Sequence, residues 1–334
     1  MKFLRYILFP IVPIYFVVTW TRNILYDFGW KKSKSYKLPI ICVGNLSVGG
    51  TGKSPMIEYL IRLLKTDFTL ATLSRGYKRE SSGFKLANNS DSAKSIGDEP
   101  FQFYNKFGQD ILVSVDANRQ HGIESLKDLN VKPEIILLDD AFQHRKVKAG
   151  FNILLTTYNN LYCFDMVLPT GNLREPRSGA KRANIIVVTK CPVSITEQEK
   201  ERIVSKLKPT NKQLVFFSTI SYSNKVFSID KELEVSLLRH FTLVTGIANA
   251  NPLVDYLKTK GLEFKHFNFK DHHVFTEKEV DDLSDFECIV TTEKDFMRLK
   301  SERKLQNKLY YLPIEISIDR AEVFNNLVLD YVKN

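Results

Sequence analysis

Residues 38–64 of the chain read LPIICVGNLSVGGTGKSPMIEYLIRLL. The apolar run at 38–43 predicts a buried strand, and a glycine-rich stretch at 44–54 follows it directly. From Met56 onward apolar residues recur at helical spacing, and Pro55 would lie in the first helical turn, where a missing N–H costs little. A strand, a glycine-rich loop, Gly-Lys-Ser and a helix in this order are typical of a phosphate-binding P-loop.

The glycine-rich stretch contains the residues that we expect to bind a nucleoside triphosphate. Glycines let successive backbone N–H groups turn toward phosphate oxygens, and the following helix adds its partial positive charge. The predicted contacts are eight consecutive residues: Ser47, Val48, Gly49, Gly50, Thr51, Gly52, Lys53 and Ser54. Lys53 would reach the β- and γ-phosphates, and Ser54 would ligate Mg²⁺. Ser47 departs from the strict pattern, which has glycine at that position.

A second apolar run ends in two acidic residues. Residues 135–140 read IILLDD, so Asp139 and Asp140 would stand at the carboxyl end of a buried strand. A P-loop protein needs an acidic residue there to help hold Mg²⁺, and we expect Asp139 to be that ligand, with Asp140 beside it. Thr189-Lys190, at the end of another apolar run, is not followed by an aspartate that would read guanine, which favours ATP over GTP.

The loop and the acidic pair leave the reaction open, because kinases, GTPase switches and ATPases all share them. The main alternative to a kinase is a membrane-associated P-loop GTPase or ATPase that acts as a switch or metallochaperone. Five more polar clusters lie along the chain, and each is weak alone because a charged loop is usually a solvated surface. They are Gly97–Pro100, Asp139–Arg145, Asn172–Pro176, Asp271–His273 and Thr291–Asp295.

Taken in order, these clusters resemble the motifs of the tetraacyldisaccharide 4′-kinase family, the lipid A 4′-kinases of the Gram-negative envelope. The resemblance covers nearly the whole chain, and Ala141 and Ser54 are the two visible departures, where the family usually has glycine and commonly has threonine. Serine keeps the metal-binding hydroxyl. The matching segments are LYDFGW at 25–30, VGNLSVGGTGKSP at 43–55, LSRGY at 73–77, GDEP at 97–100, DDAFQHR at 139–145, LREP at 173–176, DHH at 271–273 and TEKD at 292–295.

The resemblance implies a specific reaction and a set of site residues. The family transfers the γ-phosphate of ATP to the 4′-hydroxyl of an acylated glucosamine disaccharide 1-phosphate, with Mg²⁺, to give lipid IVA. By position, Asp98 resembles the carboxylate that takes the acceptor proton, and His272 resembles its partner. Asp139 and Asp140 resemble the metal-side acids. The supporting or substrate-contacting candidates are His144, Glu175, His273 and Arg75, where Arg75 either contacts the substrate 1-phosphate or makes a structural ion pair.

The amino-terminal segment is apolar and is flanked by basic residues. Residues 6–20 read YILFPIVPIYFVVTW, which as a helix would be about 22 Å long, shorter than the roughly 30 Å hydrocarbon core of a bilayer. A cleaved signal peptide, a buried core helix and a membrane anchor are the alternatives, and no small-residue cleavage site follows the run. We favour a monotopic or barely spanning anchor at the cytoplasmic face of the inner membrane, because an acylated substrate stays in the bilayer.

The positive charge of the chain is concentrated beside this apolar segment. The formal net charge is +10, and residues 1–37 alone carry seven basic residues and one acidic residue. Such an excess favours nucleic acid, an anionic membrane or an anionic substrate as the partner. Because no aromatic-studded RNA-binding pattern is present, we expect a membrane surface and the acylated disaccharide lipid as partners, and no nucleic acid.

The length and composition of the chain bound its architecture. With 334 residues, 43% hydrophobic and 26% charged, the chain is long enough for two domains, and this composition excludes a disordered or collagen-like protein. Its four cysteines form no CxxC pair, which excludes a disulfide framework and a cysteine-type zinc site. We expect an α/β protein, namely a P-loop NTPase-like, doubly wound, mostly parallel sheet with a second, smaller α/β domain and an amino-terminal apolar helix.

The apolar runs place the elements of these two domains. We expect an anchor at 1–30, a P-loop core at 31–220, a connector at 221–234 and the smaller domain at 235–334. Asp98 and His272 would then face each other across the interdomain cleft of a monomer. The predicted strands lie near 38–43, 69–73, 111–115, 135–139, 152–156, 185–189 and 214–219, and in the smaller domain at 241–245, 263–269, 288–291 and 309–313, alternating there with helices at 251–260 and 277–284.

Overall fold

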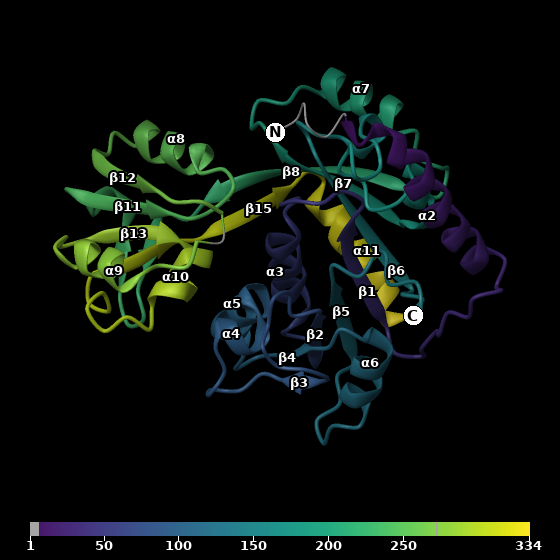
Figure 1. Cartoon of the computed structure of the whole chain (residues 1–334), viewed down its shortest axis with the longest axis horizontal. Coiled ribbons are helices and arrows are strands. Elements are labelled where there is room, and N and C mark those ends of the chain that lie inside the picture. Colours follow the sequence, from purple (N-terminus) through teal and green to yellow (C-terminus); the bar gives the residue numbers. More distant parts are fainter. Residues whose placement is uncertain (1–6, 272) are drawn as a thin grey trace.

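The computed structural model of the chain describes residues 7–271 and 273–334. Within these residues the strands form two separate sheets, which lie at opposite ends of the molecule (Figure 1). The larger sheet is mostly parallel and only its two outer pairs, β15 with β8 and β3 with β4, are antiparallel. Its strand order is β15 (Ile314–Ile318), β8 (Leu214–Tyr222), β7 (Ile185–Cys191), β6 (Phe151–Thr157), β1 (Ile40–Asn45), β5 (Ile135–Asp139), β2 (Leu70–Ser74), β4 (Leu112–Val115) and β3 (Lys85–Leu86).

Helices cover both faces of the larger sheet, so it is doubly wound as predicted. One face packs against α3 (Lys53–Leu64), α5 (Asp98–Phe107) and α11 (Ala321–Lys333), in a core that includes Leu60, Phe103 and Phe324. The other face packs against α6 (Arg119–Lys127) and α7 (Glu197–Leu207). Each strand in the middle of the sheet is an apolar run, because both of its faces are buried.

The smaller sheet and its helices form the small unit, residues 223–313. The strand order is β10 (Glu232–Glu234), β9 (Lys225–Phe227), β14 (Leu309–Leu312), β13 (Ile289–Thr292), β11 (Phe241–Thr245) and β12 (Phe264–Asn268), with helices α8 (Asn251–Thr259), α9 (Glu277–Ser284) and α10 (Glu293–Leu299). The four strands from β14 to β12 are parallel, as the alternating pattern predicts. The polar stretch assigned to a connector contains the β9–β10 hairpin, which pairs with β14 and so belongs to this sheet.

The carboxyl end of the chain differs from the predicted division at residue 235. After β14 the chain crosses back, and β15 pairs with β8 in the larger sheet from Ile314 to Ile318. Helix α11 then packs into the core beside α3, where Phe324 and Val328 are fully buried. The sequence pattern did not reveal this return, because pairing partners that are about a hundred residues apart leave no local signal. In Figure 1 the β8–β15 ribbon runs between the two sheets.

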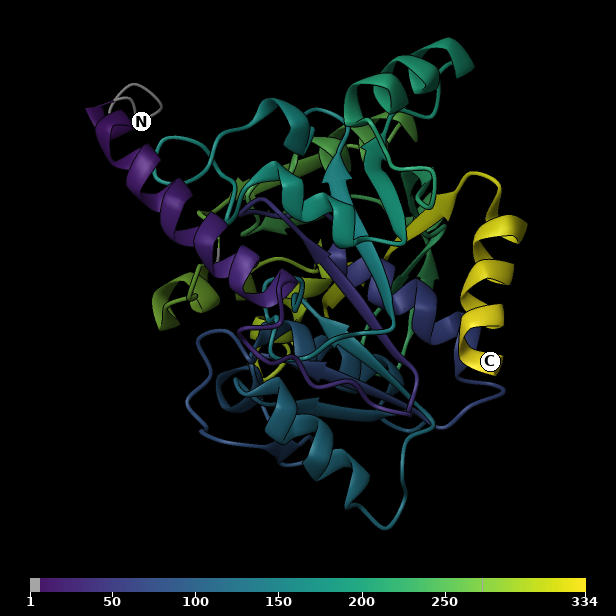
Figure 2. The same ribbon diagram turned by 90° about the vertical axis from the view of Figure 1, so that its right-hand side faces the viewer.

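The amino-terminal segment forms a short 3₁₀ helix, Phe9–Ile11, followed by α2 (Val12–Asp27). Figure 2 shows α2 along the outside of the molecule, away from α11. Its apolar side chains are largely exposed, including Ile14 at 65% and Val18 at 62%, which excludes the buried core helix. Among the described helices, none combines the length and apolar character that crossing a membrane requires.

A buried ion-pair cluster joins the small unit to the larger sheet. Lys106 of α5 lies 2.8 Å from the Glu58 carboxylate of α3 and also contacts Glu293, the first residue of α10. Gln102 donates hydrogen bonds to both carboxylates, at 2.7 Å to Glu58 and 3.3 Å to Glu293. Glu58 and Glu293 are 1% and 6% exposed, and both contact the Lys106 ammonium, while Arg62 Nη2 lies 3.3 Å from Glu58 as a second basic partner. This cluster fixes the first turn of α10 against α5.

The burial of these carboxylates predicts a pH-dependent stability. Burial, together with the neighbouring Glu58 carboxylate, raises the pKa of Glu293 to about 7. The folded protein therefore holds this proton to a higher pH than the unfolded chain does, and stability is lost as the pH rises from about 4.5 to 7. Glu293→Gln removes that loss, so the melting temperature of the variant relative to the parent should rise between pH 5 and pH 8. Glu322→Gln, at an exposed carboxylate on α11, is the control. The expectation would be contradicted if the melting temperature of Glu293→Gln relative to the parent did not change with pH.

Candidate active site

The parallel pairing of β1 and β5 brings the glycine-rich loop and the acidic pair to one edge of the sheet. Val43 of β1 is in register with Asp139 of β5, where β5 ends, and β1 ends two residues further on at Asn45. The loop follows β1 and leads into α3, which begins at Lys53 and has Pro55 in its first turn, as predicted. Gly49 and Gly52 adopt left-handed conformations with φ of 110° and 88°, which residues with a Cβ rarely accept.

Side chains from neighbouring strand ends hold the loop. Asn45 Nδ2 donates to Thr51 Oγ1 at 2.9 Å, and Thr189 Oγ1 donates to the Thr51 carbonyl at 2.8 Å. Lys190 Nζ donates to the Gly50 carbonyl at 2.7 Å. Thr189 and Lys190 therefore contact the loop directly from near the end of β7. In the sequence, this pair was noted only because no guanine-reading aspartate follows it.

The structure also accounts for the serine at position 47. Ser47 pairs with Leu173 in an isolated antiparallel bridge, and the Val48 N–H donates to the Asn172 carbonyl at 2.8 Å. A residue in such an extended pairing does not need the left-handed conformations that glycine allows. The departure from the strict P-loop pattern is thus compensated by pairing with the Asn172–Pro176 segment.

Asp139 is buried beneath the loop, and one of its carboxylate oxygens accepts no hydrogen bond from the described residues. Ser74 Oγ donates to Asp139 Oδ2 at 3.2 Å, whereas Oδ1 is buried and has no hydrogen-bond partner among the described residues. Burial raises the pKa of Asp139 to about 7, and the nearby Glu99 and Asp140 carboxylates add to the shift. A buried oxygen without a donor and a carboxyl that resists ionisation both fit a position where a cation is expected.

Asp140 links the loop lysine to an arginine from the next segment. Its carboxylate accepts from Arg174 Nη1 at 2.9 Å through both oxygens and lies 3.7 Å from Lys53 Nζ. Asp140 has a φ of 48°, a left-handed conformation that aspartate tolerates better than most residues. Arg174 was not among the predicted site residues, although it lies in the predicted Asn172–Pro176 cluster.

Asp98 and Glu99 lie in the first turn of α5, directly after Gly97. Arg298 Nη2 donates to Asp98 Oδ2 at 2.6 Å, and Arg298 Nη1 donates to Asp295 Oδ1 at 2.9 Å. Glu99 Oε1 accepts from Ser54 Oγ at 3.1 Å and lies 3.4 Å from Lys294 Nζ. Glu99, which follows the predicted acceptor-activating residue Asp98 in the chain, thus contacts the predicted metal ligand Ser54.

The small unit contributes two basic residues that sequence reasoning missed. Lys294 and Arg298 both come from α10, and their spacing of four residues places them on one face of that helix. Lys294 lies in the predicted Thr291–Asp295 cluster, although it was not among the predicted site residues. For Arg298 the only signal was its spacing from Lys294 on a helix that Thr292 caps by accepting from the Asp295 N–H at 3.2 Å. The partners of Lys294 and Arg298 depend on how α10 packs against α5, and the local sequence pattern does not reveal this packing.

The two histidines of the Asp271–His273 cluster have different outcomes. His272 lies outside the described residues, so its predicted pairing with Asp98 stays a prediction. His273 stacks on Phe269, with ring centroids 4.7 Å apart, and its Nε2 is 3.0 Å from Glu279 of α9. His273 is therefore held inside the small unit by these two contacts.

Glu175 binds the amino-terminal helix to the larger sheet. It is 1% exposed and accepts from Asn23 Nδ2 at 2.6 Å, from Arg182 Nη2 at 2.7 Å and from Gln143 Nε2 at 3.0 Å. Because Asn23 is the buried residue of α2, this cluster anchors the helix, and a structural role for Glu175 accounts for all these contacts.

His144 and Arg75 lie in a basic environment near Asp139. Burial lowers the pKa of His144 to about 4, and the positive charge of Arg119 adds to the shift. His144 Nε2 has no hydrogen-bond partner in the described part of the chain. Arg75 follows β2 and is exposed, and its guanidinium makes no ion pair within the described residues. The structural ion pair that was one of the two predicted roles of Arg75 is therefore not found there.

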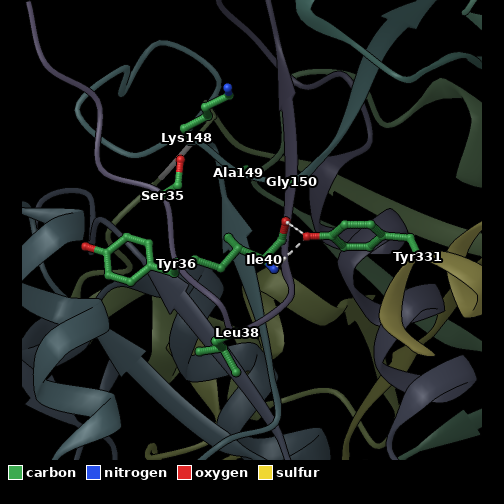
Figure 3. Close-up of a pocket in the computed structure, with 8 residues that line it drawn as sticks. All are labelled: Ser35, Tyr36, Leu38, Ile40, Lys148, Ala149, Gly150 and Tyr331. Carbon is green, nitrogen blue, oxygen red and sulfur yellow. Dashed lines mark hydrogen bonds between the residues drawn. The ribbon is translucent and has the colours of Figure 1, made fainter. Parts of the chain in front are cut away.

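The pocket in Figure 3 lies at the opposite end of β1 from this site. It has a volume of about 160 Å³ and is lined by Ser35, Tyr36, Leu38, Ile40, Lys148, Ala149, Gly150 and Tyr331. The Tyr331 hydroxyl bonds both the N–H and the carbonyl of Ile40, at 3.0 and 3.1 Å, and so fixes α11 to the start of β1. These contacts make it part of the packing between α11 and the sheet.

Comparisons with known proteins agree with this geometry. The family model described as tetraacyldisaccharide-1-P 4′-kinase matches residues 4–333. The chain belongs to this family. A tetraacyldisaccharide 4′-kinase of Flavobacterium johnsoniae is 50% identical over all of this chain and 98% of its own length, and one of Bacteroides thetaiotaomicron is 42% identical over 98% and 93%.

A solved structure of the family has the same fold. The crystal structure of LpxK from Aquifex aeolicus in complex with ATP superimposes with a TM-score of 0.79 at 31% identity, over 98% of this chain and 99% of that one. Family membership confirms that the chain is a kinase of lipid A biosynthesis, and the alternative of a GTPase or ATPase switch is set aside. The predicted α/β fold is confirmed as well.

Proposed function

We propose that this kinase transfers the γ-phosphate of ATP to the 4′-hydroxyl of a tetraacyl glucosamine disaccharide 1-phosphate, giving lipid IVA. The observation that carries the proposal is the chain of contacts from the P-loop to Asp98. Ser54 bonds Glu99 at 3.1 Å, and Asp98 precedes Glu99 at the first turn of α5. A phosphate cradle and a carboxylate able to accept a hydroxyl proton are thus adjacent, as phosphoryl transfer requires.

The nucleotide would occupy the loop from Ser47 to Ser54. The loop N–H groups and Lys53 bind its phosphates, while Asp140 and Arg174 hold the Lys53 ammonium in place. Mg²⁺ fits beside Ser54 and the unpartnered oxygen of Asp139, where it would neutralise charge that builds up on the phosphates. Asp140 keeps its position through two basic partners and supports this site.

Asp98 would act on the acceptor hydroxyl. The 4′ oxygen forms a bond to the γ-phosphorus as the bond from that phosphorus to the β–γ bridging oxygen breaks, ADP leaves, and the hydroxyl proton passes to Asp98. Arg298 fixes the orientation of the Asp98 carboxylate at 2.6 Å. His272 remains the proposed partner that shares this proton, and Arg75 and His144 are proposed to lie toward the substrate 1-phosphate.

The exposed apolar surface of α2 supports action at a membrane. Ile14, Val17, Val18 and Trp20 are between 46% and 65% exposed, while Asn23 and Tyr15 bind the helix to the rest of the protein. A helix that is anchored on one side and apolar on the other suits the boundary of a bilayer. We place the protein, as a monomer, at the cytoplasmic face of the inner membrane, where ATP and an acylated substrate meet.

The reaction is tested with labelled ATP, Mg²⁺ and a tetraacyl disaccharide 1-phosphate in detergent. The parent protein should give a bisphosphorylated lipid, and Asp98→Asn should lower kcat by about 10²–10⁴-fold, because the acceptor proton loses its base. Binding of ATP to Asp98→Asn should change little, since Asp98 does not line the loop, whereas Lys53→Ala should weaken it. ATP hydrolysis by the parent without any phosphorylated lipid would refute the proposed reaction.

Membrane binding is tested by flotation with anionic phospholipid vesicles. The triple substitution Ile14→Ser, Val17→Ser and Val18→Ser removes exposed apolar area from α2 and should lower the vesicle-bound fraction at least about tenfold. Because these side chains are exposed, the fold should be unaffected. Val193→Ser, at an 89% exposed residue outside α2, is the matched control. Equal binding of the triple variant and the control would exclude α2 as the membrane contact.

A further inference from the structure

The first turn of α10 is held rigidly against the helix that carries Asp98. Glu293 is fixed there by Lys106 and Gln102 of α5. Thr292 caps the same turn through the Asp295 N–H. Lys294 lies between Glu293 and Asp295, so the position of its backbone is fixed on both sides. Its side chain is 34% exposed and extends toward the P-loop from the small unit.

The Lys294 ammonium lies close to the predicted phosphate and metal positions. It is 3.4 Å from Glu99 Oε1, and the same oxygen accepts from Ser54 Oγ at 3.1 Å. Only one carboxylate oxygen therefore separates Lys294 from the hydroxyl that we expect to ligate Mg²⁺. None of the roles proposed above includes Lys294.

Three lysines from three different elements gather around the loop. Lys53 begins α3, Lys190 ends β7 and Lys294 belongs to α10. The pKa of Lys190 is lowered by burial of its ammonium against the loop and by the positive charges of Lys294 and Lys53, although the rest of its side chain is exposed. Ammonium groups placed this close repel one another unless an anion lies among them.

The present partners of these lysines compensate little of that charge. Lys53 is 3.7 Å from Asp140, which already has Arg174 at 2.9 Å, and within the described residues Lys190 bonds only a neutral carbonyl. Lys294 contacts Glu99 at 3.4 Å, longer than an ideal charge-assisted hydrogen bond of about 2.8 Å. A triphosphate in the loop would offer all three lysines better partners.

We propose that Lys294 binds the γ-phosphate of ATP, exchanging the Glu99 carboxylate for a phosphate oxygen when the nucleotide is bound. This inference rests on the proposed function and assigns a further residue to the same site. A cation brought to the transferring phosphoryl group from a second structural unit stabilises the charge that spreads over its oxygens. Lys294 thereby links nucleotide binding to the position of α10, which also holds Asp98 through Arg298.

The test compares nucleotides that differ only in the γ-phosphate. Lys294→Met should weaken binding of a non-hydrolysable ATP analogue by about tenfold, the loss of one charge-assisted hydrogen bond, and leave ADP binding within about twofold. It should also lower kcat by about 10²-fold or more. Lys294→Arg keeps the charge and should retain the preference for the ATP analogue over ADP. Lys304→Met, at an exposed lysine of the small unit paired with Asp281, should behave as the parent.

Two results would overturn the inference. One is a Lys294→Met variant with the kcat and the ATP-analogue preference of the parent protein. The other is equal weakening of both nucleotides, which indicates that Lys294 only supports the packing of α10. The binding measurements need no lipid, so they separate this inference from the proposed reaction, which fails only if the parent protein forms no phosphorylated lipid.

Discussion

The parallel pairing of β1 with β5 sets the position of every group beneath the candidate nucleotide site. In register, Val43 and Asp139 bring the start of the P-loop and the buried acid to the same edge of the sheet. Both strands are buried on two faces, so a slip in their register would place polar groups in the core. The neighbouring strand β7 then supplies Thr189 and Lys190 to the loop, and the Asn172–Pro176 segment pairs with its first residues.

The second requirement is the contact between α5 and α10. Opposite charges match along these two helices: Arg298 with Asp98, Lys294 with Glu99, and Lys106 with Glu293. The small unit is otherwise joined to the larger sheet through the β8–β15 ribbon, which runs between the two (Figure 1). Asp98, the residue proposed to activate the acceptor, is the first residue of α5, and its partner Arg298 belongs to α10 of the small unit. A movement of the small unit would therefore also move this partner of Asp98.

Local patterns in the sequence were sufficient for most of the fold. Every predicted strand overlaps an observed one, because apolar runs between glycine-rich or polar stretches are local signals. The P-loop and Asp139 were likewise readable from order and spacing. The return of β15 and α11 to the larger sheet, the helical position of Asp98, and the contribution of Lys294, Arg298 and Arg174 were not readable, since each depends on packing between distant segments. The role of Glu175 near the phosphates stays a prediction, and its contacts with Asn23, Gln143 and Arg182 show how α2 is anchored.

The central claim is that nucleotide, metal and acceptor-activating carboxylate meet at the edge where β1 and β5 end. A crystal structure with a non-hydrolysable ATP analogue and Mg²⁺ tests this most directly. The account predicts the triphosphate within the loop from Ser47 to Ser54, the metal on Ser54 and Asp139, and the γ-phosphate facing the first turn of α5. A nucleotide bound outside the loop, or one whose γ-phosphate points away from Asp98, would contradict it.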